Sequence, residues 1–140
     1  MTRPPAAYVL GSLASGALWG ALAYALGARA IGSSIVGGVM CSPIIGLVIG
    51  LVFRSVHRMR TGPAAFAALL SLYLGAALFG FAVGCTDLSR GVHGRFPIEV
   101  VFQAVVALVW GTTITGYVLV LWPLAFLNHR LLGRLDSEQA

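Results

Sequence analysis

Four long apolar runs, separated by short polar breaks, make up most of the chain. They extend from about Tyr8 to Leu26, Ile31 to Phe53, Ala64 to Cys85 and Ile98 to Leu127. None carries a charged residue in its interior, and a helix needs roughly 20 mainly apolar residues to cross a bilayer. The pattern predicts an all-α, polytopic integral membrane protein with four transmembrane helices, forming one membrane domain over residues 1–140.

The composition excludes the usual soluble classes. Of the 140 residues, 59% are hydrophobic and 9% are charged, with a mean hydropathy of +0.93. A soluble domain carries about 25% charged residues, and a disordered chain is polar and charge-rich. All nine basic residues are arginines in short clusters between apolar runs. That distribution is typical of membrane loops, so we expect no nucleic-acid partner.

The arginines also predict an orientation. Six fall on the side of the two termini and the second loop, and three on the other: Arg3, Arg54, Arg58, Arg60, Arg130 and Arg134 against Arg29, Arg90 and Arg95. Because cytoplasmic loops are enriched in basic residues, we expect both termini in the cytoplasm, with the chain in a bacterial inner membrane. Arg54, Arg58 and Arg60 are expected to contact anionic lipid at that surface.

Small residues recur every fourth position on three of the runs. We call these sets the small-residue ladders: Ser12, Gly16 and Gly20; Gly38, Ser42, Gly46 and Gly50; and Ala76, Gly80 and Gly84. Small faces let membrane helices approach closely and gain dispersion energy. Three ladders exceed what one four-helix chain needs, which favours a homo-oligomer or a larger membrane complex.

A weak internal repeat has two interpretations. Residues Ser12–Gly20 resemble Ser71–Gly80, and the second and fourth runs both end in a His-Arg pair, at His57 and His129. A duplicated two-helix hairpin would give parallel copies. Chance similarity between helices rich in glycine, alanine and leucine explains the same pattern.

A neutral polar layer is expected near the middle of the membrane. Its members are Cys41, Ser42, Tyr73, Thr112 and Thr113. Their hydroxyls can bond carbonyls one turn earlier, or they can surround a small neutral or lipid-like ligand. Pro43 should kink the second helix beside this layer.

The chain contains few residues of the types that catalyse reactions or bind metals. We find no set of nucleophile, base and acid and no phosphate-binding loop, so we expect neither an enzyme nor a cofactor. His57 and His129 are interpreted as interfacial residues rather than metal ligands. Cys41 near mid-depth and Cys85 at the outer end of its helix lie too far apart to form a disulfide.

The function that these observations favour is structural or accessory, through packing of the small-residue ladders against another copy or a larger membrane complex. Two alternatives remain open. One is a small oligomeric channel or facilitator for a neutral solute. The other is a protein that handles a lipid or quinone.

Overall fold

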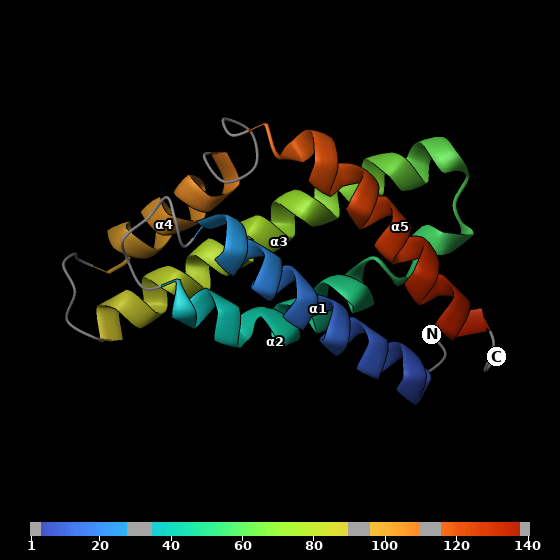
Figure 1. Ribbon diagram of the computed structural model, residues 1–140, viewed down its shortest axis with the longest axis horizontal. Coiled ribbons are helices and arrows are strands. Elements are labelled where there is room, and N and C mark those ends of the chain that lie inside the picture. Colours follow the sequence, from blue (N-terminus) through green and yellow to red (C-terminus); the bar gives the residue numbers. More distant parts are fainter. Residues whose placement is uncertain (1–3, 28–34, 90–95, 110–115, 138–140) are drawn as a thin grey trace.

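The computed structural model describes residues 4–27, 35–89, 96–109 and 116–137. Every regular element in these ranges is a helix, which confirms the all-α prediction. The elements are α1 (Ala6–Gly27), α2 (Val36–Val52), the short 3₁₀ helix η1 (Arg54–Arg58), α3 (Thr61–Ser89), α4 (Ile98–Leu108) and α5 (Val118–Ser137) (Figure 1).

Two of the helices are long and apolar enough to cross a membrane. They are α1, over Ala6–Leu26, and α3, over Thr61–Ser89. The apolar helix α2 is shorter, with 17 residues. Large apolar side chains also cover much of the outside, including Leu18, Met40 and Leu119 with 73%, 74% and 76% of their surface exposed. An exposed apolar surface of this kind marks a contact with a membrane or with another protein.

The fourth apolar run is not one helix, and this corrects the sequence prediction. In place of a continuous helix from Ile98 to Leu127, α4 ends at Leu108 and α5 begins at Val118. Gly116 lies just before α5 with a φ of 70°, a left-handed conformation that ordinary residues rarely adopt. The run Gly-Thr-Thr-Ile-Thr-Gly over 111–116 is rich in residues of low helix propensity. Hydropathy alone does not register this local preference.

The helices form two hairpins that lie side by side (Figure 1). The first pairs α1 with α2. In the second, α4 and α5 return one after the other along α3: Gly80 of α3 packs on Ala104 and Ala107 of α4. Nearer the start of α3, the indole of Trp122 in α5 donates a 2.7 Å hydrogen bond to the Ala65 carbonyl. The α4–α5 pair therefore takes the place that one long helix was predicted to fill.

The interior lies where α1, α3 and α5 meet. Its buried centre is Ala68, Leu72 and Ala125, and Trp19 is among the partly buried side chains packed around it. The C-terminal half of α5 also crosses α1, because Gly11 lies against Leu132 and Leu135. Consequently α5 belongs to both hairpins and closes one end of the bundle.

Candidate functional site

The ladders of α1 and α2 face each other. A Cβ built on Gly16 would lie 2.8 Å from the Cα of Gly46, a separation that real Cβ atoms do not show. On either side of this contact, Gly50 lies against the Ser12 side chain and Gly20 against the Ser42 side chain. The two backbones are therefore in direct contact, which only very small side chains permit.

The remaining ladder positions also pack within the chain. Gly38 lies against the ring of Phe79, and a Cβ on Gly80 would come within 2.8 Å of the Ala104 Cα. Gly84 is buried on α3, and Ala76 lines an internal cavity. These small residues thus make contacts inside one chain, whereas the number of ladders led to the expectation that some of them contact a partner.

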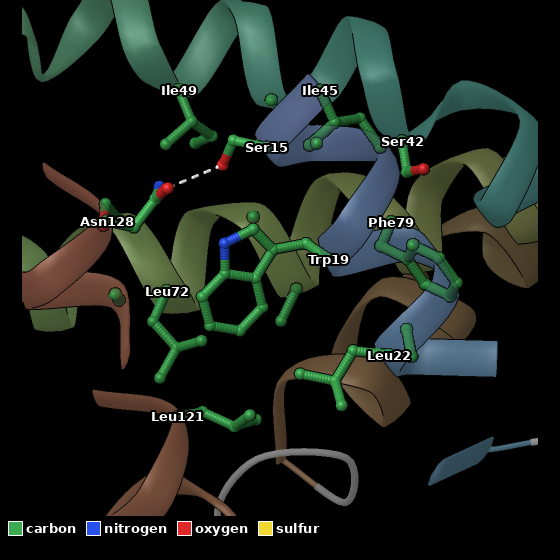
Figure 2. Close-up of a pocket in the computed structure, with 18 of the residues that line it drawn as sticks. Ser15, Trp19, Leu22, Ser42, Ile45, Ile49, Leu72, Phe79, Leu121 and Asn128 are labelled. Atoms are coloured by element: carbon green, nitrogen blue, oxygen red, sulfur yellow. Dashed lines mark hydrogen bonds between the residues drawn. The ribbon is translucent and has the colours of Figure 1, made fainter. Parts of the chain in front are cut away.

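That cavity lies between α1, α2, α3 and α5 and has a volume of about 280 Å³. Its wall is mostly apolar, and Trp19, Ile45, Ile49, Leu72, Phe79 and Leu121 contribute large side chains (Figure 2). On α1 the lining extends from Ser15 to Leu26, a rise of about 16 Å at 1.5 Å per residue. The space is therefore elongated along the helices.

One end of the cavity is polar. Ser15 of α1 donates a 2.9 Å hydrogen bond to the Oδ1 of Asn128 in α5, as Figure 2 shows. Beside it, the Ser71 hydroxyl of α3 lies 2.7 Å from the Nε2 of His129. We call Ser15, Ser71, Asn128 and His129 the polar end. Its two hydrogen bonds tie α5 to α1 and to α3.

The predicted mid-membrane layer is dispersed in the structure. Ser42 lines the cavity, and its hydroxyl donates to the Val39 carbonyl at 2.7 Å. Cys41 lines a different groove, and Tyr73 is half-buried on α3. Thr112 and Thr113 lie outside the described residues. The polar groups that do converge belong to the polar end instead.

The second groove, of about 360 Å³, lies between α2 and α3. Both cysteines line it, and both are free thiols. The sequence pattern predicts Cys85 at the outer end of its helix, well away from Cys41. In the structure α3 continues past Cys85 to Ser89, and both cysteines lie on one groove.

The bundle closes at the η1 end through an ion pair. The Arg54 guanidinium lies 2.6 Å from the Oδ1 of Asp136 near the end of α5, and the Asp136 side chain is 1% exposed. Hydrogen bonding to Arg54 lowers the pKa of the Asp136 carboxyl below its ordinary value. The other oxygen of Asp136 lies 3.5 Å from Arg58. The ion pair therefore fixes the last turn of α5 against η1.

The ion pair distinguishes Arg54 from Arg58 and Arg60, the other two arginines predicted to contact anionic lipid. Arg54 is engaged with Asp136, whereas the Arg58 side chain is 68% exposed and Arg60 is exposed. Nearby, Arg130 donates to the His57 carbonyl at 3.1 Å and lies over the Phe126 ring. Within the described part of the chain, no three His, Cys, Asp or Glu side chains gather as a metal site would require.

The polar end has no signal in the hydropathy, which falls at Asn128, so the predicted fourth run ends at Leu127, before Asn128 and His129. A usable signal was present. Leu121, Ala125, Asn128 and Leu132 recur at helical spacing and mark one continuous face that includes the asparagine. The chain matches no protein family model, no curated protein and no solved structure.

Proposed function

We propose that this chain is a membrane protein of four crossing segments that binds a small apolar molecule from the bilayer in the cavity between its helices. The first three segments are α1, α2 and α3. The fourth is the α4–α5 pair, because the 11 residues of α4 rise only about 16 Å of a core roughly 30 Å thick. The exposed apolar side chains of all these helices support this arrangement.

The orientation follows from the charges at one end. Arg54, Arg58, Arg60, Arg130 and Arg134 lie on η1, at the start of α3 and at the end of α5. We propose that this end faces the cytoplasm of a bacterial cell, in keeping with the preference for basic residues on that side. Arg58 and Arg60 are the exposed side chains of this cluster that can meet anionic lipid headgroups there.

The cavity is the observation that carries the proposed function. At about 280 Å³ it exceeds the roughly 150 Å³ apolar cavity that accepts benzene. Its elongated shape and apolar wall suit a hydrocarbon chain or ring. The described residues that line it include one histidine and no Asp, Glu, Cys, Lys or Arg, so we propose binding without catalysis.

The cavity also favours one of the roles that the sequence left open. An accessory role drew its support from small-residue ladders available to a partner, and those ladders pack within the chain. Ligand binding requires a preformed, mainly apolar space with a few polar groups. The structure provides such a space, so handling of a lipid-like molecule becomes the favoured role.

The test fills the cavity without disturbing the helices. Gly75 lines the cavity, and a Cβ built there meets nothing within 4 Å. Gly75→Leu should occupy the space, whereas Gly62→Leu places the same side chain at an exposed position of α3 with equally open surroundings. Native mass spectrometry in a mild non-ionic detergent should show one apolar adduct on the wild type and on Gly62→Leu, and none on Gly75→Leu. A wild type without an adduct, or an adduct retained by Gly75→Leu, contradicts the proposal.

A further inference from the structure

The polar end presents unpaired hydrogen-bond donors to the cavity. The Ser71 hydroxyl is already engaged, because it lies 2.8 Å from the Ala68 carbonyl and 2.7 Å from the Nε2 of His129. The Oδ1 of Asn128 is taken by Ser15. The amide nitrogen of Asn128 carries two N–H groups, and these have no partner among the described residues.

A second free donor lies beside it. The indole of Trp19 lies in the middle of the cavity, with its nitrogen edge toward Ser15 and Asn128 (Figure 2). Its N–H has no partner in the part of the chain that the structure describes. Trp19 and Asn128 are both partly buried, and an indole N–H that faces an apolar space usually finds an acceptor. Trp19 and Asn128 therefore present donors to the same space.

The surroundings exclude a charged acceptor. No arginine or lysine is among the described residues that line the cavity, and Arg54 is held by Asp136 at the η1 end. A carboxylate or phosphate buried there would lack the cationic partner that normally compensates its desolvation. The other polar lining groups do not change this balance, because Ser42 already donates to Val39 and Tyr117 lies at the far, N-terminal end of α5.

We infer that the cavity selects an apolar molecule bearing a neutral carbonyl, with Asn128 and Trp19 donating hydrogen bonds to that oxygen and the apolar wall enclosing its chain. This inference rests on the proposed function and specifies its ligand. A quinone ring and an acyl ester both present such a carbonyl. Either one would satisfy the two donors while its hydrocarbon part extends toward Leu26.

The experiment compares four probes that differ in the head group: decylbenzoquinone, methyl dodecanoate, decylbenzene and dodecanoate. Binding is measured as the rise in unfolding temperature of the delipidated protein in non-ionic detergent, at a series of probe concentrations. The variants are Asn128→Leu, which keeps the side-chain size, and Trp19→Phe, which removes the N–H but keeps an aromatic ring. For each probe the affinity of a variant is divided by that of the wild type, so partitioning into detergent cancels.

For one of the two carbonyl probes, each variant should bind about tenfold more weakly than the wild type, as expected for the loss of one hydrogen bond. Which probe shows this loss identifies the source as quinone or ester. For decylbenzene the ratio should stay near one. Ratios near one for both carbonyl probes, or a larger loss for dodecanoate than for either of them, overturn the inference. Decylbenzene binding that is lost only in Gly75→Leu would still leave the proposed function intact, so the two ideas fail separately.

Discussion

The two hairpins begin with similar sequences and close differently. In the first, α1 and α2 touch from Ser12–Gly50 to Gly20–Ser42, with backbone against backbone at Gly16 and Gly46. In the second, Gly80, which corresponds to Gly20 in the repeat, packs on α4 in the same manner. Beyond Gly116 the returning chain becomes α5, which contacts α3, α1 and η1. The shared use of Gly20 and Gly80 is compatible with a duplicated hairpin, and the duplication stays a prediction.

The difference explains where the cavity comes from. A hairpin joined by small residues along its whole length leaves no room between its helices. Where α3 loses a close-packed partner, side chains of different sizes from several helices meet instead. Gly75, which faces the cavity with nothing within 4 Å, lies on α3 between the part that contacts α4 and the part that contacts α5.

The largest effect is expected from enlarging a residue in the first hairpin, which tests the close contact between α1 and α2. Gly46→Leu places a branched side chain into the backbone of Gly16. Neither backbone can yield without separating the helices, so we expect a loss of about 3 kcal/mol in stability, the upper part of the usual range for overpacking. Thermal unfolding in detergent measures it. Val48→Leu on the same helix is the control, because Val48 is 41% exposed. Equal unfolding temperatures for the two variants would mean that the α1–α2 contact is wrong.

A smaller change tests the contact between α3 and α4 in the second hairpin. Gly80→Ala adds one methyl group within 2.8 Å of the Ala104 Cα and 2.7 Å of the Ala107 Cβ. We expect a loss of about 1–2 kcal/mol. The helix α4 is short and can shift to relieve part of the clash. Chemical denaturation in mixed detergent micelles would measure the loss, and a stabilised variant would contradict the close contact between α3 and α4.

Removing the ion pair at the η1 end tests whether this pair, in addition to the polar end, holds α5 against the rest of the bundle. Asp136→Asn removes the charge that Arg54 contacts, and we expect the unfolding temperature to fall by a few degrees. The pKa of the Asp136 carboxyl is lowered in the folded state, so its contribution is fully present above the unfolded pKa, near 4. It is lost as the pH falls through the lower, folded pKa. The wild type should therefore lose stability in acid more steeply than Asp136→Asn. Parallel pH profiles would show that the pair contributes nothing.

The smallest expected effect has the opposite sign. Gly75→Ala makes the same substitution as Gly80→Ala on the same helix, but its methyl group enters open space. Because alanine is the better helix former, we expect a gain of about 0.5 kcal/mol. Differential scanning calorimetry of Gly75→Ala and Gly80→Ala under the same conditions measures the gain in stability expected for the first and the loss expected for the second. A loss at Gly75 would mean that the cavity is narrower than the structure shows.

The all-helical class could be predicted from the sequence, because long uninterrupted hydrophobic stretches rarely form anything other than helices. It also marks the positions where helices approach most closely, since a glycine such as Gly16 or Gly46 every fourth residue has a direct steric meaning. The break before Val118 has no hydropathy signal, because Gly and Thr are near-neutral in hydropathy and carry no charge, although both lower helix propensity. Hydropathy and helix propensity therefore disagree in this segment.

The candidate site was harder to anticipate for a related reason. Ser15 and Asn128 are separated by 113 positions, and no local pattern shows that they meet. Ser71 alone resembles a hydroxyl bonded to its own helix, which it also is. Only the path of α5, continuing to Ser137, brings His129 and Asn128 into the bundle.

The hydrogen bonds of the polar end also set an order of assembly. Asn128 and His129 would be costly to place in lipid alone, yet their partners Ser15 and Ser71 precede them by 113 and 58 positions. During synthesis, α1 and α3 have left the ribosome before α5 emerges. The last helix therefore meets a surface that already offers both partners. A chain truncated before α5 should insert stably, whereas α5 expressed alone should not remain in the membrane.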